Sequence, residues 1–253
     1  MSTLRLIQFT DTHLYGDADG KLRGVATYPA LLAVIEHARA RHWPCQAILA
    51  TGDLVQDDPE GYARFRDVFS GLGVPVYCIP GNHDEPAAMT QALSGPPFQL
   101  GGVARFPGWV VVLLDSFLAG KAGGRLSAES LAGLDAALKA NPRLHALVCL
   151  HHHPVAVHSR WLDQVGLENP DEFFSVLDRH RNVRAVLWGH VHQIHDTERN
   201  GVRLFSTPST CAQFMPLSPG FAIDHRPPGY RWLELNPDGT ITTEVVWVEG
   251  FTS

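Results

Sequence analysis

The sequence lacks the features that would mark a disulfide-rich, zinc-ribbon or membrane-spanning protein. Its 253 residues contain four cysteines, none in a C-x-x-C pair, and three lie in apolar stretches where a reduced thiol packs as a small hydrophobic side chain. No apolar run approaches the roughly 20 residues that a membrane-spanning helix needs. The first residues, MSTLRLIQFTDTH, enter a strand-like run without the pattern of a secretory signal. We therefore expect a cytoplasmic protein that does not engage a membrane.

Positive charge is also scarce. The chain has 20 Lys and Arg against 26 Asp and Glu, which gives a formal net charge of −6. Nucleic-acid binding needs clustered basic residues to neutralise phosphates, and the sequence has no such cluster, so we expect no nucleic-acid partner. Apolar residues make up 45% and charged residues 18%, which is typical of a globular protein, and the length suits one domain over residues 1–253. The unusual feature is the content of 14 histidines, many of them clustered.

The distribution of apolar residues predicts a layered α/β fold. Short, nearly continuous apolar runs occupy residues 4–9, 47–50, 74–79, 110–114, 146–150 and 183–188, as expected of strands buried on both faces. Helical spacing lies between them, at residues 31–38, at 131–138 behind the candidate N-cap Ser127, and after Asn169-Pro170. Residues 232–248 predict an antiparallel hairpin at a sheet edge, with its turn at Asn236-Pro237-Asp238-Gly239. We expect residues 201–253 to complete the same domain.

Polar clusters follow five of the six apolar runs. Each has an ordinary structural explanation when taken alone, as a turn, a helix cap or a surface histidine pair. Five clusters that each close an apolar run are hard to explain in that way. In open α/β sheets, ligands bind at the carboxyl ends of strands, so these segments predict one shared site. The clusters are Asp11-Thr12-His13, Gly52-Asp53, Gly81-Asn82-His83-Asp84, His151-His152-His153 and Gly189-His190-Val191-His192.

The chemistry of these side chains is that of oxygen and imidazole ligands without thiolate. Such ligands suit Mn, Fe, Zn or Co rather than a cysteine-rich structural zinc site. One Asp-x-His pair, the Asp after Gly52, the Asn before His83, one of the three consecutive histidines and the two histidines of the last cluster give seven candidate ligands. This is more than one ion needs once it also keeps water, so two ions are implied. Asp53 is the natural bridge, because one carboxylate can hold two cations about 3.5 to 4 Å apart.

In this order, the motifs D-x-H, G-D, G-N-H-D, a histidine after a strand and G-H-x-H resemble those of the calcineurin-like metallophosphoesterases. The resemblance spans residues 11–192. It implies a four-layer α/β/β/α sandwich with two central mixed β-sheets and a dinuclear site. By position, it implies one ion on Asp11, His13 and His192, a second on Asn82, His151 and His190, and Asp53 between them.

The second half of the chain resembles the bacterial class III 3′,5′-cyclic AMP phosphodiesterases. The segments that carry this likeness are HHHPVAVHSRWLDQVGLENPDEF, GHVHQ, STPSTCAQFMP and PGYRWLELNPDGTITTEV. It implies hydrolysis of 3′,5′-cyclic AMP to 5′-AMP by attack of a metal-bridging hydroxide on phosphorus, which would lower cellular cyclic AMP. Two divalent ions are implied, Fe or Mn first, with Zn and Co as alternatives. The residues Thr207-Pro208-Ser209-Thr210 predict a simple turn.

Two other functions stay open. A related phosphodiesterase could act on 2′,3′-cyclic nucleotides or glycerophosphodiesters, because metal motifs recognise the phosphate and not the base. A non-catalytic metal-binding module would be expected to have lost at least one ligand, and none is replaced. The sequence does not separate a monomer from a homodimer.

His83 is the candidate that stabilises the phosphoryl group or protonates the leaving oxygen, with Asp84 orienting its ring. Asn82, His13 and His192 are expected beside His83 at the substrate phosphate. Asp57 either hydrogen-bonds within the site or caps a helix ahead of Pro59.

Arg160 and Trp161 either border the substrate or, for the tryptophan, pack on a sheet. Among the three consecutive histidines, His151 is the predicted ligand because it is the first residue past the apolar run. Pro154 holds His153 extended, which makes it an exit residue. His152 is the alternative ligand.

Overall fold

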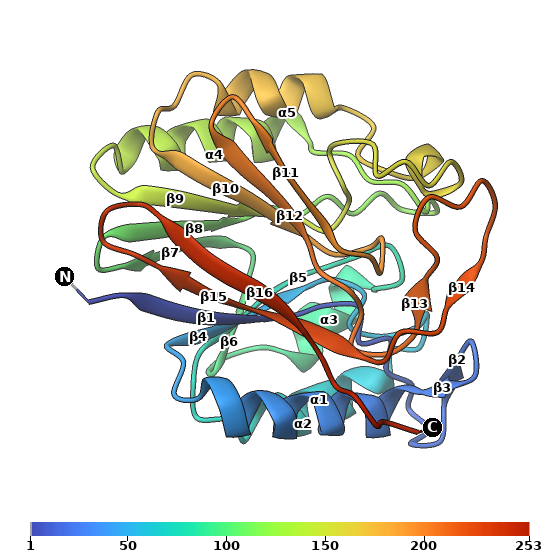
Figure 1. Ribbon diagram of the computed structural model, residues 1–253. Helices are drawn as coiled ribbons and strands as arrows, with labels where there is room; N and C mark the ends of the chain where they lie inside the picture. Colours follow the sequence, from blue (N-terminus) through green and yellow to red (C-terminus); the bar gives the residue numbers. More distant parts are fainter. Residues whose placement is uncertain (1, 253) are drawn as a thin grey trace.

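Two six-stranded mixed sheets form the centre of the protein, and the computed structural model describes residues 2–252 (Figure 1). The first sheet has the order β16-β15-β1-β4-β5-β6, in which β1, β4, β5 and β6 run parallel and β15 and β16 join antiparallel. Its strands are β1 (Leu4–Phe9), β4 (Ala47–Thr51), β5 (Val76–Ile79), β6 (Phe98–Leu100), β15 (Gly229–Leu235) and β16 (Ile241–Trp247).

The second sheet has the order β11-β12-β10-β9-β8-β7, with a parallel centre and an antiparallel strand at each edge. The two sheets stack face to face, and helices cover both outer faces, so the predicted four-layer α/β/β/α sandwich is confirmed (Figure 1). Its strands are β7 (Gly102–Phe106), β8 (Trp109–Leu113), β9 (His145–Cys149), β10 (Val183–Trp188), β11 (His195–Arg199) and β12 (Val202–Ser206).

The continuous apolar runs arise because the central strands contact two cores at once. In β1, Ile7 and Phe9 pack against the helical layer, whereas Leu4 and Leu6 face the core between the sheets. Successive side chains of a strand point to opposite faces, so a strand with a core on each side has no polar face. All four cysteines are buried, Cys211 in a small separate cluster with Ala30 and Ala212, and none forms a disulfide.

The apolar spacing predicts α1, α4 and α5 but gives no sign of α2 or α3. Ser127 caps α4 as expected, since its Oγ accepts a hydrogen bond from the Ser130 backbone N–H at 3.0 Å. Asn169 stands at the N-cap of α5, but its side chain makes no cap bond and instead accepts from the Leu126 backbone N–H at 3.0 Å. The helices are α1 (Thr27–His42), α2 (Gly61–Ser70), α3 (Pro86–Ala92), α4 (Ala128–Ala140) and α5 (Pro170–Leu177), with a short 3-10 turn, η1, at Leu162–Gln164.

Two small hairpins lie beyond the carboxyl end of β1, on the right of Figure 1. They are β2 (Lys21–Leu22) with β3 (Val25–Ala26), and β13 (Gln213–Phe214) with β14 (Ile223–Asp224). Sequence patterning did not predict either, because each strand is two residues long. The predicted hairpin of β15 and β16 is confirmed, and β16 forms the edge of the first sheet. Within residues 2–252, no helix combines the length and apolar content needed to cross a membrane.

Candidate metal centre

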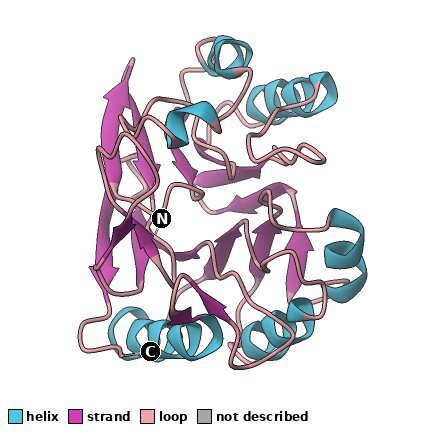
Figure 2. Ribbon diagram, turned by 90° about the vertical axis from the view of Figure 1, so that its right-hand side faces the viewer, coloured by secondary structure: helices cyan, strands magenta, loops and turns pink. Residues whose placement is uncertain are grey.

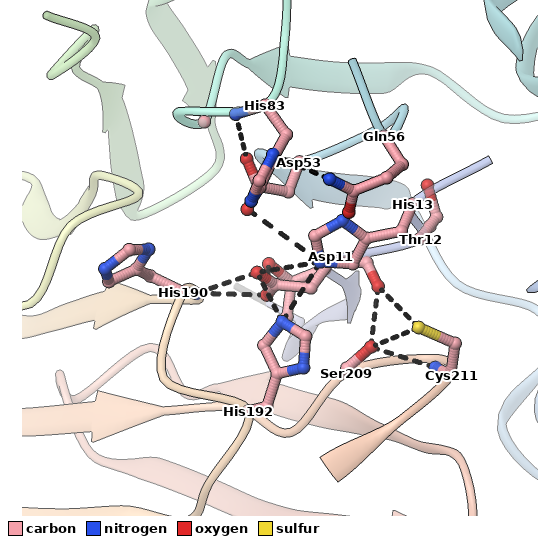
Figure 3. A network of polar contacts seen from close by, with 12 residues as sticks. Asp11, Thr12, His13, Asp53, Gln56, His83, His190, His192, Ser209 and Cys211 are labelled. Atoms are coloured by element: carbon pink, nitrogen blue, oxygen red, sulfur yellow. Dashed lines mark hydrogen bonds and ion pairs between the residues drawn. The ribbon is translucent and has the colours of Figure 1, made fainter. Parts of the chain in front are cut away.

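The five polar clusters converge at the carboxyl ends of parallel strands from both sheets. Figure 3 shows this place with Asp11, His13, Asp53, His83, His190 and His192. Figure 2 shows the same end of the sandwich facing the viewer, with loops from both sheets meeting between the helical layers. Asp11 follows β1, Asp53 follows β4, and His151 follows β9. His190 and His192 follow β10. Five segments spread over 180 residues of sequence therefore place acidic and imidazole side chains in one buried place, as the motif pattern predicted.

One group of candidate ligands comprises Asp11, His13 and His192. Their ligand atoms lie within 4.8 Å of one another, and all three side chains are buried. His192 Nε2 is 3.3 Å from Asp11 Oδ1 and 3.1 Å from His13 Nε2. This spacing of one carboxylate and two imidazoles suits a single cation.

Asp53 lies between this group and a second one. Its Oδ2 is 3.8 Å from His13 Nε2 and 3.3 Å from His151 Nε2. Its Oδ1 accepts the backbone N–H of His83 at 2.9 Å, which fixes the orientation of the carboxylate (Figure 3). One carboxylate thus contacts residues from both groups, which is the position that a bridging ligand requires.

The second group contains His151, His152 and His190, whose ligand atoms again lie within 4.8 Å of one another. His151 is the one that reaches Asp53, whereas His152 Nδ1 is 2.8 Å from Ser116 Oγ. The geometry therefore favours His151 over His152. Asn82 lines a cavity together with His190, and its Oδ1 is buried without a hydrogen-bond partner among the described residues.

Three of the histidines have one ring nitrogen occupied by a backbone carbonyl. His151 Nδ1 donates to Thr51 O at 2.8 Å, His192 Nδ1 donates to Ala212 O at 2.7 Å, and His190 Nε2 donates to Val165 O at 3.0 Å. A proton on that nitrogen leaves a lone pair on the other, which is how metal-binding histidines are oriented. Together with the orphaned Asn82 oxygen, this arrangement fits divalent cations.

Electrostatics places most of these groups in the form that binds a cation. Burial lowers the pKa of His13 to about 3, so its ring is neutral at pH 7. Burial alone would raise the pKa of the Asp53 carboxyl, but His151 outweighs it and holds this pKa well below the ordinary value. Burial also opposes ionisation of His151, yet Asp53 raises the pKa of this histidine to about 9. A cation at Asp53 therefore competes with a proton on His151, because metal ligation needs a neutral ring.

The backbone at the site is strained. Five of the seven candidate ligands have positive φ, between 45° and 68°, a region that non-glycine residues seldom occupy: Asp11, His13, Asp53, His190 and His192. Such conformations persist only where surrounding contacts impose them, and they concentrate at functional sites. Gly81 and Gly189 allow the close approach, because a Cβ at either would collide with the carboxylate of Asp53 or Asp11.

His83 stands at the mouth of the site, with its side chain about one-third exposed. Its Nδ1 is 2.9 Å from Asp57 Oδ2 and 2.8 Å from Gln56 Nε2. The expectation that Asp84 orients this ring is wrong, because Asp84 is buried and faces the other way. It accepts the backbone N–H of Gly81 at 2.8 Å and of Leu54 at 3.1 Å.

Asp84 therefore braces the loop that carries Asp53. The Tyr62 hydroxyl donates a further hydrogen bond to it at 2.9 Å. Burial and the nearby charge of Asp53 raise the pKa of Asp84 to about 7. Of the two roles considered for Asp57, the contact with His83 is the one observed. The turn ahead of α2 is held by Asp58, whose Oδ1 accepts the Glu60 backbone N–H at 3.1 Å.

The segment Thr207-Pro208-Ser209-Thr210 is a buried support and not a simple turn. Ser209 Oγ donates to the carbonyl of Asp11 at 2.6 Å and accepts the Cys211 backbone N–H at 2.9 Å (Figure 3). The Thr210 backbone N–H donates to Thr10 O at 3.2 Å. These bonds tie the C-terminal quarter of the chain to the strained residue Asp11. Nothing in the local sequence predicts them, because the partners are almost 200 residues apart.

A cavity of about 220 Å³ opens in front of these residues and has two chemically distinct sides. We call its polar side the metal-facing wall, formed by His13, Asp53, Asn82, His83, His190 and His192. We call the aromatic part of its lining the aromatic wall, formed by Trp161, Phe214 and Phe221. Trp161 thus borders the cavity, whereas Arg160 is exposed and lies outside its lining. Sequence reasoning missed Phe214 and Phe221, which no motif marks.

This chain belongs to the calcineurin-like phosphoesterase family, whose model matches residues 4–194. The resemblance inferred from the motifs is therefore confirmed. Members of the family use a dinuclear divalent metal centre, and the described residues supply Asp and His groups suited to hold one.

The chain is similar over nearly its whole length to enzymes named for one substrate. It is 40% identical to the 3′,5′-cyclic adenosine monophosphate phosphodiesterase CpdA of Vibrio vulnificus, covering 96% of this chain and 90% of that protein. It is 41% identical to CpdA of Escherichia coli K12, covering 96% and 89%. Among solved structures, a dimetal phosphatase from Danio rerio shares the fold, with a TM-score of 0.62, 17% identity, and coverage of 97% of this chain and 99% of that one.

Proposed function

We propose that this protein hydrolyses 3′,5′-cyclic AMP to 5′-AMP with two divalent metal ions. The observation that carries the proposal is the likeness, at about 40% identity over 96% of the chain, to phosphodiesterases named for cyclic AMP. The donor set supports it, because the Asp and His candidates form groups whose ligand atoms lie within 4.8 Å of one another, and five of the seven candidates, Asn82 among them, line one cavity. A non-catalytic metal-binding module would not need a cavity beside the ligands.

The ions would be held by two ligand groups that share Asp53. Asp11, His13 and His192 would hold the first, and Asn82, His151 and His190 the second. When bound, two such ions offset the charge of phosphoryl oxygens and lower the pKa of a water toward about 7. Fe and Mn fit this mixed oxygen and imidazole set, and so do Zn and Co.

The protein itself would orient the ester and supply a proton. Asn82, His13 and His192 line the cavity beside His83, where the phosphate would lie. With Nδ1 of His83 donating to Asp57, the protonated form of the ring carries its second proton on Nε2, and this proton would pass to the ribose 3′ oxygen as a water oxygen displaces it from phosphorus. Asp57 would fix the ring in that orientation. The phosphate stays on the 5′ oxygen, so the product is a 5′-monophosphate.

We also propose that residues 1–253 act as one domain. β15 and β16 extend the first sheet beside β1, so the C-terminal residues complete the sheet that begins at the N-terminus. The described residues of this domain provide a cavity sized for a small-molecule substrate.

The test is a panel of esters offered to protein reconstituted with each metal. The substrates are 3′,5′-cyclic AMP, 2′,3′-cyclic AMP and glycerophosphocholine, and the products are separated by chromatography. We expect 5′-AMP to form from the 3′,5′-cyclic ester, with kcat/KM at least about tenfold above those of the other two, a difference of about 1.4 kcal/mol in transition-state binding. Preferential cleavage of 2′,3′-cyclic AMP or of glycerophosphocholine would contradict the proposal.

A further inference from the structure

The aromatic wall is an ordered cluster of three rings. Trp161 lies 5.1 Å from Phe214 and 5.3 Å from Phe221, with interplanar angles of 73° and 76°. Phe214 and Phe221 are 5.6 Å apart at 67°. These edge-to-face contacts are favourable arrangements for aromatic rings, so each ring holds the other two in place.

The wall is connected directly to the metal-facing wall. Phe214 stacks on His192, with ring centroids 4.1 Å apart and an interplanar angle of 9°. The guanidinium of Arg23, from the β2–β3 hairpin, lies 4.6 Å from the centroid of Phe221. The two small hairpins therefore meet over the cavity, and one ring of the aromatic wall, Phe214, directly contacts the candidate metal ligand His192.

The rings of the aromatic wall keep part of their surface exposed. Phe221 is 48% exposed, and Trp161 and Phe214 are intermediate in burial and pack against the core between the second sheet and its helices. The Trp161 indole N–H has no hydrogen-bond partner among the described residues. Apolar rings that line a cavity beside charged groups and remain partly exposed are typical of a ligand-binding surface.

From this we infer that the aromatic wall binds the nucleobase of the substrate while the phosphate lies at the metal-facing wall. The inference rests on the proposed function and extends it to a part of the substrate that metal ligands do not contact. Every base presents a π-face, so stacking tolerates different bases. The wall therefore selects cyclic nucleotides as a class over baseless diesters, and it does not by itself separate adenine from guanine.

The experiment compares two substrates in a matched set of variants. The substrates are 3′,5′-cyclic AMP and ribose 3′,5′-cyclic phosphate, which has the same reacting ester and no base. The quantity measured is the ratio of kcat/KM for cyclic AMP to kcat/KM for the baseless ester. The variants are Phe221→Leu, which keeps apolar volume but removes the ring, Phe221→Tyr, which keeps the ring, and Leu217→Ala as the control. Leu217 is 71% exposed and lies outside the cavity lining.

We expect Phe221→Leu to lower the ratio by about tenfold, within the range that loss of one base–aromatic stack produces, and mainly through KM. Phe221→Tyr should restore the ratio, and Leu217→Ala should leave it at the wild-type value. Because Phe221 is half exposed, its variants should fold, which the melting temperature checks. Trp161→Leu removes a second ring and gives an independent measurement of the same ratio.

The outcomes separate this inference from the proposed function. If the wild-type protein hydrolyses the baseless ester as well as it hydrolyses cyclic AMP, the inference is overturned. An unchanged ratio in both Phe221→Leu and Trp161→Leu overturns it too, as does an equal loss on both substrates, because either result assigns the rings a structural role. If the wild-type protein cleaves neither 3′,5′-cyclic ester but cleaves 2′,3′-cyclic AMP, the proposed function fails, and with it the placement of this substrate.

Discussion

The two walls of the cavity are built in different ways. The metal-facing wall consists of side chains at strand ends, most of them buried, held by strained backbone and by hydrogen bonds to carbonyl groups. The aromatic wall consists of partly exposed rings from a loop and a small hairpin, held by contacts with one another and with His192. The backbone at the strand ends fixes the first wall, and side-chain packing orders the second. Groups fixed by the backbone suit the reacting phosphate, and packed rings suit the part of the ligand that only needs to be held.

The sharpest way to break this comparison is to remove the residue that joins the two ligand groups. Asp53→Ala should lose both ions and reduce kcat by about 10³-fold or more, because metal ions supply several kcal/mol of charge stabilisation in such reactions. Elemental analysis and turnover measure the two effects. The matched control is Asp57→Ala, which should keep its metal. Full metal content in Asp53→Ala would refute the bridging role.

Removal of His83 should impair catalysis at the metal-facing wall without loss of the bound metal ions. His83→Ala is expected to lower kcat by about 10²- to 10⁴-fold, the range for loss of a general acid, while two ions remain bound. Turnover and metal content are measured on the same preparation. A variant that retains both metal and full turnover would show that His83 is a structural loop residue.

Substitution of Asp57 and of Asp84 should have different effects, because Asp57 positions the His83 ring and Asp84 supports the backbone of the loops. Asp57→Ala is expected to lower kcat by about tenfold and to change the pH profile of kcat, because His83 loses the acceptor that fixes its ring. Asp84→Ala should instead lower the free energy of unfolding by roughly 1–3 kcal/mol, because the N–H groups of Gly81 and Leu54 lose their acceptor. Turnover against pH and denaturant unfolding distinguish the two. Equal effects of both substitutions on both measurements would contradict the assignment.

The smallest effect is expected at the aromatic wall. Binding of the product 5′-AMP, compared with binding of inorganic phosphate, distinguishes this wall from the metal-facing wall. Trp161→Leu should weaken binding of 5′-AMP by about tenfold, through loss of a ring contact, in metal-loaded protein. Binding of inorganic phosphate, which touches only the metal-facing wall, should stay the same. Titration calorimetry measures both. Equal weakening of the two ligands would show that Trp161 supports the metal ligands instead.

The metal-facing wall could be predicted from the sequence because each ligand is tied to a strand. The end of a buried apolar run marks the carboxyl edge of a sheet, and Asp11, Asp53 and His190 are close to such ends. Of the aromatic wall, the sequence marks only Trp161 as a candidate to border the substrate. Phe214 and Phe221 could not be predicted, because they belong to a hairpin with two-residue strands and no periodicity. Tertiary packing alone brings them to Trp161.

The partner of His83 was assigned incorrectly for a related physical reason. Asp84 is adjacent in sequence, but it turns inward to accept the backbone N–H groups of Gly81 in its own loop and of Leu54 in the loop after β4. Asp57, 26 residues away, reaches the ring because its loop follows the neighbouring parallel strand β4. Proximity in space follows the order of strands in the sheet, which the sequence does not state.

The bond from Ser209 to Asp11 has a consequence for how the protein is made. Residue 11 leaves the ribosome early, but its backbone is fixed by residue 209, and its carboxylate accepts the N–H of His190 at 3.0 Å. While residues 190 and 209 are still unsynthesised, Asp11 lacks the groups that hold its backbone and its carboxylate. Metal acquisition is therefore expected only after most of the chain has been synthesised and folded, so an early intermediate would not trap an ion.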